Sequence, residues 1–277
     1  MEASHGRRPS WPDLVGIVLT AALAAAACGS SGATPSASGA TSTPASTART
    51  PSASIPSPTA EPVCPTVTTQ TVTSSASDST WTVSLKEPLV SGVPATVAAA
   101  MNSAINNKVS GFVSDFNGQN LTPVVEGQPS TLDGQFTIGL CSPTLLSLRF
   151  EVTEYVTGAA STFELVSGLN FAVSTGTVIQ LTDLFTSSAA ALPVLSSQAQ
   201  TLLLADPDLG GVLSWPSSPP MSFFETCWVF TTAGLEFTWN QGQIAASAAG
   251  APSVTIPWTD PSLHSVISTS GPAAEFL

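Results

Sequence analysis

The sequence carries little charge and few of the side chains on which most enzymes depend. Only 9% of its 277 residues are charged, with six Lys or Arg against 18 Asp or Glu, and two are histidines. Nucleic-acid binding needs clusters of Lys and Arg that neutralise phosphates, so a net charge of −12 argues against a nucleic-acid partner. The acidity keeps an exported domain soluble, and it would also steer a basic partner toward it.

Recognisable catalytic motifs are also missing. No G-x-S-x-G, S-x-x-K, P-loop or G-x-G-x-x-G pattern occurs. His264 is the one histidine beyond the N-terminal region. A single histidine cannot build a His-rich metal site, and a catalytic triad needs a partnered nucleophile, so we predict a surface position on a terminal helical turn. We therefore expect no enzymatic activity, no cofactor and no metal.

The acidic residues that suggest chemistry each have a simpler explanation. Glu151 and Glu154 are three residues apart on a predicted strand, which points them to opposite faces and argues against a glycosidase pair. Asp183, in "LTDLF", is predicted to cap a helix. Asp206 and Asp208 flank Pro207, and we expect a solvated turn there rather than a calcium site.

Cysteine is scarce, with four residues in the chain. If Cys28 is lipidated, as argued next, Cys64, Cys141 and Cys227 remain. An exported compartment favours disulfides, and three thiols allow one bridge and one unpaired cysteine. Their wide separation does not fit a zinc site. The sequence leaves the pairing open.

The first 62 residues are predicted to be an export signal and a tether. Arg7 and Arg8 precede an uncharged apolar stretch, residues 14–27, that is too short for a comfortable membrane span. Small residues lead directly to Cys28, as in a bacterial lipobox, so residues 1–27 are predicted to be a lipoprotein signal peptide. Lipidated Cys28 would anchor the protein to the outer face of the cell membrane. Cleavage at an ordinary Ala-x-Ala site, which would release a secreted protein, is the alternative.

Residues 28–62 are rich in Ser, Thr, Ala and Pro and almost lack large apolar side chains. Such a segment cannot offset the entropy of ordering, so we predict a disordered tether. From Cys64 onward the pattern becomes that of a packed domain. Alternating residues in "CPTVTTQTVTSS" and "STWTVSL" predict a hairpin, and an apolar stripe predicts a helix over 94–116. That stripe is Val97, Met101, Ile105, Val109, Phe112 and Phe116.

A loop over 117–134 is expected to separate this region from further strands. In "TLLSLRFEVTEYV", Leu146, Leu148, Phe150 and Val152 alternate with Arg149, Glu151 and Thr153, which predicts a half-buried antiparallel strand. A second helix is predicted over 187–204, with Leu192, Leu195, Ala199 and Leu202 on one side. Three strands follow, and no βαβ repeat is recognised. We predict an α+β domain over 63–270, in parts 63–118 and 131–270, with two main helices packed on an antiparallel sheet.

Three stretches in order carry a family resemblance. "STWTVSLKEPLVSGV" with "VAAAMNSAIN", "YVTGAAS" with "LNFAVSTGTVIQLTDLF", and "FTTAGLEFTW" with "AAGAPSVTIPW" resemble the extracellular domain of RsiV-type anti-sigma factors and PdaC-type peptidoglycan deacetylases. The domain also occurs in secreted mycobacterial antigens. The resemblance covers residues 66–267. It departs at residues 157–161, where Ser161 replaces the histidine common in the family's Thr-Gly-Gly-Ala-His loop.

The resemblance implies the extracellular module without the activities of either relative. An anti-sigma factor needs a cytoplasmic sigma-binding segment, and few residues precede the apolar stretch. A deacetylase needs a further metal-dependent domain, and no residues remain for it. The module is non-catalytic, and in RsiV-type proteins it binds lysozyme. We therefore expect a cell-surface lipoprotein that binds a basic lysozyme-like hydrolase or a peptidoglycan fragment, with Trp215 as a ligand contact. A structural envelope lipoprotein with no dedicated ligand is the alternative.

Overall fold

The computed structural model describes residues 63–119, 121, 127–209 and 213–277, which all belong to one unit, residues 58–277. The predicted signal peptide, the lipidation site Cys28 and the tether over 28–62 lie outside the described residues. In the described part of the chain, no helix combines the length and the hydrophobicity that crossing a membrane requires.

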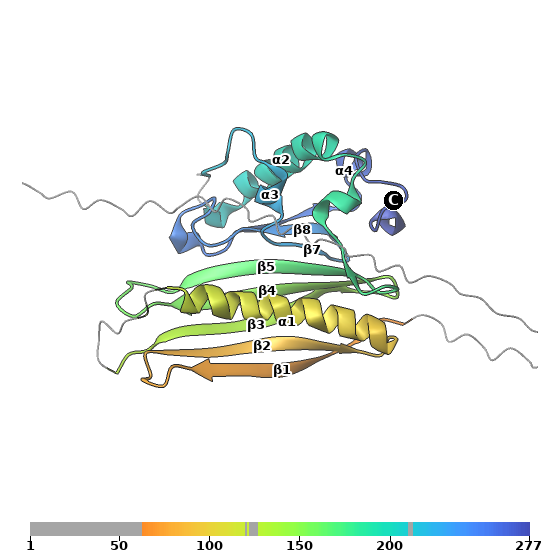
Figure 1. The fold of residues 1–277 in the computed structure, drawn as a ribbon. Coiled ribbons are helices and arrows are strands. Elements are labelled where there is room, and N and C mark those ends of the chain that lie inside the picture. The colour runs from red at the N-terminus through yellow and green to blue at the C-terminus, as the bar shows by residue number, and fades with distance from the viewer. Residues whose placement is uncertain (1–62, 120, 122–126, 210–212) are drawn as a thin grey trace, which may run out of the picture. The chain divides into compact units, whose positions relative to one another are not determined.

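A six-stranded sheet forms the larger half of the unit (Figure 1). Its strands follow the chain in the order β1 to β6, and every neighbouring pair is antiparallel except β2 with β3. Their bounds are β1 Thr66–Ser75, β2 Trp81–Ser91, β3 Ser130–Cys141, β4 Leu145–Tyr155, β5 Phe163–Ala172 and β6 Thr177–Val178. The predicted hairpin at the start of the domain is β1 with β2.

Helix α1, Ala95–Asn117, covers one face of this sheet (Figure 1). Its buried side chains are Val97, Met101, Ile105, Val109 and Phe116, which recur at helical spacing. They share a hydrophobic core with Leu146, Leu148, Phe150 and Val152 of β4. The predicted helix is confirmed to within one residue at each end, and the predicted alternation of β4 is confirmed as well. Of the predicted helix stripe, Phe112 alone is only half-buried.

The pairing of β2 with β3 corrects the sequence analysis. Trp81–Leu85 run parallel to Ser130–Gly134, and α1 connects the two strands, so the chain contains one βαβ unit that was not recognised. The expected loop over 117–134 was wrong at its end, because β3 begins at Ser130. Local pattern could not show this, since the partner that makes Ser130–Gly134 a strand lies on the other side of the helix in sequence.

A three-stranded antiparallel sheet forms the second half, with β7 Trp228–Phe230, β8 Gly234–Thr238 and β9 Ser253–Pro257. Helix α2, Ser188–Ala205, packs against β9 and is capped by Ser187, whose hydroxyl accepts a hydrogen bond from the Ala190 amide. The buried stripe of α2 is Ala191, Leu195, Ala199 and Leu203. The predicted face was therefore rotated, because Leu192 and Leu202 flank this stripe and are only partly buried.

Short helices complete the described residues. Their bounds are η1 Leu181–Leu184, η2 Pro207–Leu209, α3 Met221–Phe224, η3 Ser247–Ala249, α4 Pro261–His264 and η4 Ala274–Phe276. The last of these places Phe276 against Trp258, with ring centroids 4.1 Å apart and planes 5° from parallel. This stack closes the hydrophobic core around the small sheet.

Two glycines let the small sheet approach the large one closely. A Cβ atom on Gly168 of β5 would overlap the main chain of Trp228, and one on Gly139 of β3 would lie 2.6 Å from the Phe230 carbonyl oxygen. The side chains of Ser147 and Asn170 then satisfy polar groups of β7. Phe230 N donates to Ser147 Oγ at 2.9 Å, and Asn170 Nδ2 donates to the Trp228 carbonyl at 2.9 Å. The free edge of β7 is thus bonded to the face of the large sheet.

The predicted α+β class is confirmed. The helices divide between the two sheets, with α1 on the large one and α2 on the small one. The sheets do not follow the predicted parts 63–118 and 131–270, because β3, β4 and β5 share a sheet with β1 and β2.

Candidate functional site

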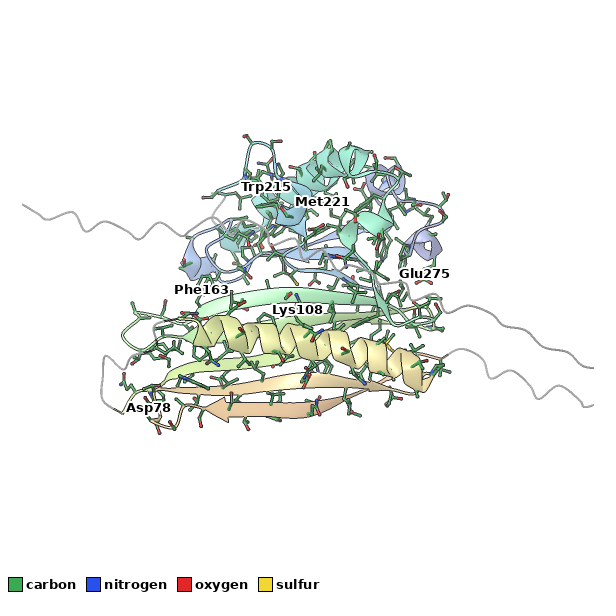
Figure 2. The ribbon with its side chains drawn as sticks, in the orientation of Figure 1. Asp78, Lys108, Phe163, Trp215, Met221 and Glu275 are labelled. Atoms are coloured by element: carbon green, nitrogen blue, oxygen red, sulfur yellow. A yellow bond between two sulfur atoms is a disulfide. The ribbon has the colours of Figure 1, made fainter. Side chains whose placement is uncertain are left out.

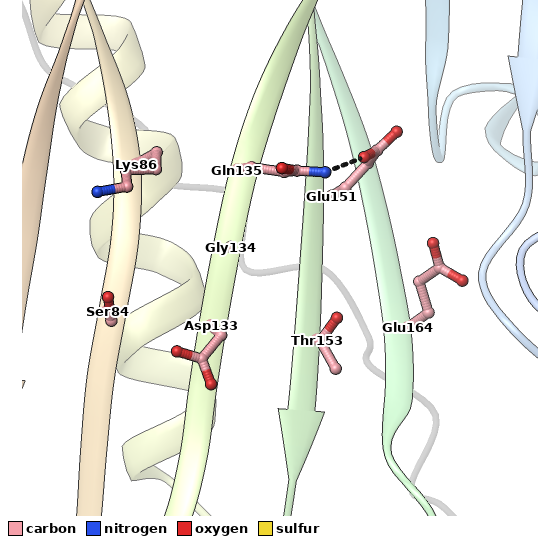
Figure 3. Close-up of a pocket in the computed structure, with 8 residues that line it drawn as sticks. All are labelled: Ser84, Lys86, Asp133, Gly134, Gln135, Glu151, Thr153 and Glu164. Carbon is pink, nitrogen blue, oxygen red and sulfur yellow. Dashed lines mark hydrogen bonds between the residues drawn. The ribbon is translucent and has the colours of Figure 1, made fainter.

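The face of the large sheet opposite α1 is covered over only part of its area. The small sheet packs on one end of β3, β4 and β5, and the rest forms an open depression of about 380 Å³ (Figure 3). We call this depression the open sheet face. It is lined by Ser84, Lys86, Asp133, Gly134, Gln135, Glu151, Thr153 and Glu164. Strand alternation places the side chains of all but Gly134 away from the core, because their neighbours in each strand point toward α1.

Glu151 lies where the open sheet face meets the small sheet. Its Oε2 accepts a hydrogen bond from Gln135 Nε2 at 2.9 Å (Figure 3). Its Oε1 pairs with Arg149. Arg149 also pairs with Glu236 of β8, with Nη1 and Oε1 2.6 Å apart. Burial alone would lower the pKa of Arg149, but the carboxylates of Glu236 and Glu151 outweigh it and raise that pKa above its usual value. This ion-pair network joins the sheets and occupies both oxygens of Glu151.

Two carboxylates remain free on the open sheet face. Within the described residues, the side chains of Asp133 and Glu164 form no ion pair or hydrogen bond. Lys86, which also lines the face, donates to Thr71 Oγ1 at 2.9 Å on the neighbouring strand β1. The open sheet face therefore offers two unpaired carboxylates, the ammonium of Lys86 and several neutral polar groups to a partner.

Sequence reasoning found part of this face. The outward side of β4, with Glu151 and Thr153, was predicted, whereas Asp133, Gln135 and Glu164 were missed. Asp133 and Gln135 alternate with Leu132 and Phe136, so the signal was present in the sequence. It was obscured because Asp133 fell within the expected loop.

Trp215, the predicted ligand contact, lies in the small-sheet half (Figure 2) and is half-buried in an aromatic cluster. Its ring lies 5.0 Å from Phe223 and 5.5 Å from Trp239, centroid to centroid. Its indole N–H donates to Ser196 Oγ at 3.1 Å. These contacts give Trp215 a packing role in the small-sheet half, away from the open sheet face, and its contact with a ligand stays a prediction.

The other predicted residues lie apart from one another. His264 ends α4 and is half-buried, with its Nε2 lacking a hydrogen-bond partner among the described residues. Asp183 caps η1, because its Oδ2 accepts from the Gln180 amide at 2.9 Å, and Ser187 caps the following α2. Asp206 Oδ1 accepts from the Asp208 amide at 2.9 Å in a turn. In the described residues, no three His, Cys, Asp or Glu side chains are grouped to hold a metal ion.

The cysteine pairing that the sequence left open is Cys64 with Cys141, whose Cα atoms are 5.4 Å apart. The bridge ties the chain just before β1 to the end of β3. Cys227 is free and buried just before β7, and burial raises the pKa of its thiol to about 12. A thiol with that pKa stays protonated at neutral pH and is a weak nucleophile.

Comparison with known proteins identifies part of this architecture. Residues 182–259 match a family described as "Protein of unknown function (DUF3298)". The match spans α2 and the three strands of the small sheet. No curated protein matches the chain.

Two solved structures resemble the chain. A DUF3298 family protein from Pseudomonas aeruginosa aligns with a TM-score of 0.53 at 13% identity, over 75% of this chain and 95% of that one. A member of the family from Bacteroides fragilis aligns with a TM-score of 0.47 at 14% identity, over 77% of this chain and 96% of that one. The first alignment shows that the fold, which extends well beyond residues 182–259, recurs in a DUF3298 protein.

Proposed function

We propose that the protein is a non-catalytic binding module, held outside the cell membrane by a lipid on Cys28, whose open sheet face binds a basic protein. The observation that carries the proposal is the pair of carboxylates, Asp133 and Glu164, that have no partner among the described residues on an open polar face, where Lys86 is the one lining cation. Beyond residue 62 the chain has three Lys or Arg, namely Lys86, Lys108 and Arg149, so the surrounding field is negative. Such a field accelerates encounter with a basic partner.

The resemblance to RsiV-type domains suggests which basic protein to test. A lysozyme-like hydrolase is the partner that this resemblance implies, and a peptidoglycan fragment is the second ligand. The geometry favours the hydrolase, because an open, shallow and acidic surface suits a protein partner better than an enclosed small-molecule pocket would.

The position of the carboxylates supports a binding function rather than hydrolysis. Glu151 is occupied by Arg149 and Gln135. Glu154, which the sequence analysis weighed as a catalytic partner of Glu151, lies on the opposite side of β4. The proposal therefore assigns the open sheet face to recognition.

The direct test is titration calorimetry of residues 29–277, which include every described residue, against a lysozyme and soluble peptidoglycan fragments. We expect saturable lysozyme binding that weakens as salt rises from about 0.01 M to about 0.15 M, because the Debye length falls from about 30 Å to about 8 Å. Absence of heat with both ligands would contradict the proposal and leave the structural envelope lipoprotein as the better account.

Membrane anchoring is tested separately from binding. The full chain should fractionate with membranes and incorporate labelled palmitate, and Cys28→Ser should release it into the soluble exported fraction. Membrane association that survives Cys28→Ser, or a wild-type chain found free outside the cell, would refute the lipid anchor without bearing on the open sheet face.

A further inference from the structure

A second depression lies on the other face of the large sheet, between α1 and the strands β5 and β6. We call it the α1 groove. Its lining residues are Ala104, Asn107, Lys108, Gly111, Phe112, Asp115, Leu169 and Val178, and its volume is about 430 Å³. Three features of this groove have no explanation within the described fold.

The first feature is Lys108, whose position on α1 is shown in Figure 2. Its side chain is half-buried, yet among the described residues it makes no ion pair and no hydrogen bond. Lys86 is bonded to Thr71 and Arg149 to two carboxylates, so Lys108 is the unsatisfied cation of the described chain. Burial lowers the pKa of Lys108, which measures the cost of holding an ammonium there without a partner.

The second feature is Gly111, one helical turn further along α1. A glycine inside a helix costs about 0.5–1 kcal/mol relative to alanine. Close packing would justify that cost, but beyond its chain neighbours and the backbone of its own helix, a Cβ atom on Gly111 would have no atom within 4 Å. The space beside Gly111 is therefore open, and it belongs to the same groove as Lys108.

The third feature is the apolar lining. Phe112 is half-buried, with its ring 6.2 Å from Phe150 of the core, and Val178 of β6 is also half-buried. With Ala104 and Leu169, they form an apolar floor and walls next to the ammonium of Lys108. The remaining polar lining residues are Asn107 and Asp115, and Asp115 stands seven residues beyond Lys108, about 10 Å along the helix axis. A pocket of this size with an apolar floor and a few polar groups suits a small ligand.

We propose that the α1 groove binds a small carboxylic acid that carries a short apolar group, with its carboxylate on Lys108 and its apolar part over Gly111 and Phe112. A carboxylate matches the ammonium in charge and would form a charge-assisted hydrogen bond in a partly desolvated place. The volume of about 430 Å³ leaves room for a chain of about eight carbons, which sets the choice of probe. This site lies on the opposite face from the open sheet face, so it is independent of the proposed function.

The test uses octanoate as the probe, with residues 29–277 and titration calorimetry. We expect saturable one-to-one binding. Lys108→Met should weaken it on the order of tenfold or more, because a hydrogen bond to a charged group is lost, whereas Lys108→Arg should retain most of it. Octanamide, which has the same chain and no charge, should bind more weakly by a similar factor. Asn106→Met, which places the same residue on the exposed side of α1, is the matched control and should leave octanoate binding unchanged.

Gly111→Ala separates binding from stability. It should raise the unfolding midpoint, because alanine favours the helix, and at the same time weaken octanoate binding by several fold, because the methyl group enters the groove. A variant that is more stable and binds equally well would contradict the placement of the ligand over Gly111.

Three outcomes would overturn the proposal. They are no saturable heat with octanoate, equal affinity for octanoate and octanamide, and an unchanged affinity in Lys108→Met. A tripeptide with a free C-terminal leucine forms a further arm. Binding of that peptide in the absence of octanoate binding would refute a small-acid site and assign the groove to a peptide terminus.

Discussion

Gly168 gives the sharpest test of how the two sheets fit together. The main chain of Trp228 crosses β5 at this glycine, so that a methyl group on Gly168 would overlap the Trp228 carbonyl oxygen and lie 2.9 Å from its nitrogen. Backbone atoms on both sides leave little freedom to adjust. Gly168→Ala should therefore push β7 away from the large sheet and destabilise the whole unit.

The size of this effect follows from the contacts at the junction. Forcing a methyl group into a closely packed contact costs about 1–3 kcal/mol. Displacing β7 also weakens the bonds from Asn170 to Trp228 and from Phe230 to Ser147, each worth about 1 kcal/mol. Because these terms overlap, we expect a loss of about 2–4 kcal/mol in the free energy of unfolding. For a unit of this size, each kcal/mol lost lowers the melting temperature by roughly 2–4 °C.

The assay is urea unfolding of residues 29–277, followed by tryptophan fluorescence. The midpoint should fall with little change in the slope of the transition. Gly111→Ala is the matched control, because the same substitution on α1 meets open space and should raise stability by about 0.5–1 kcal/mol. If Gly168→Ala stays within about 0.5 kcal/mol of the wild type, the described contact between the sheets is wrong.

Three further perturbations test separate features. Replacing Cys64 and Cys141 with serine should lower the free energy of unfolding by about 4 kcal/mol, because the bridge closes a loop of 77 residues; an equal urea midpoint would argue against this pairing. Cys227 titrates at about pH 12 when folded against an ordinary value of 9.0, so only the unfolded chain loses this proton in between. Stability should therefore fall by up to about 1.4 kcal/mol per pH unit from about pH 9 upward, and Cys227→Ala should remove that slope; parallel slopes in urea unfolding would contradict it. Phe276→Ala should cost about 1–2 kcal/mol through the lost stack on Trp258, and an unchanged melting temperature would mean that this stack contributes nothing.

The elements that the sequence predicted best are those with a strong local period. The stripe on α1 and the alternation along β4 identify a helix and a strand without any knowledge of their partners. The stripe predicted for α2 was rotated from the observed one. Nearly every position of that helix is apolar or small, so its sequence does not show which side is buried. Which side was buried depended on β9, far along the chain.

The arrangement of the sheets depends on contacts between distant residues. Gly139 and Gly168 look like ordinary strand glycines until β7 is placed over them. Ser147 and Asn170 look like outward polar residues, yet they are buried because they bond the edge of β7. The open sheet face is whatever the small sheet leaves uncovered, so its composition of Asp133, Gln135 and Glu164 could not be found before the sheet was placed.

The α1 groove is another feature that the sequence could not show. The sequence pattern predicted Phe112 as one of six core positions on α1, and the other five are buried. Only the structure shows Phe112 at the margin, beside an unpaired Lys108 and a glycine with open space around it. Periodicity identifies the buried side of a helix but does not show where that side ends.

The measurement that tests the central claim most directly is lysozyme binding by the double variant Asp133→Asn and Glu164→Gln, compared with Asp208→Asn combined with Glu225→Gln. Both pairs remove two negative charges, but Asp208 and Glu225 do not line the open sheet face. An exposed charge pair is worth about 0.2–1 kcal/mol, so two lost pairs should weaken binding roughly two- to thirtyfold and flatten its salt dependence. The account predicts that the first variant loses affinity while the control stays close to wild type. Equal losses in both would show that net charge alone attracts the partner and that the open sheet face is not its binding site.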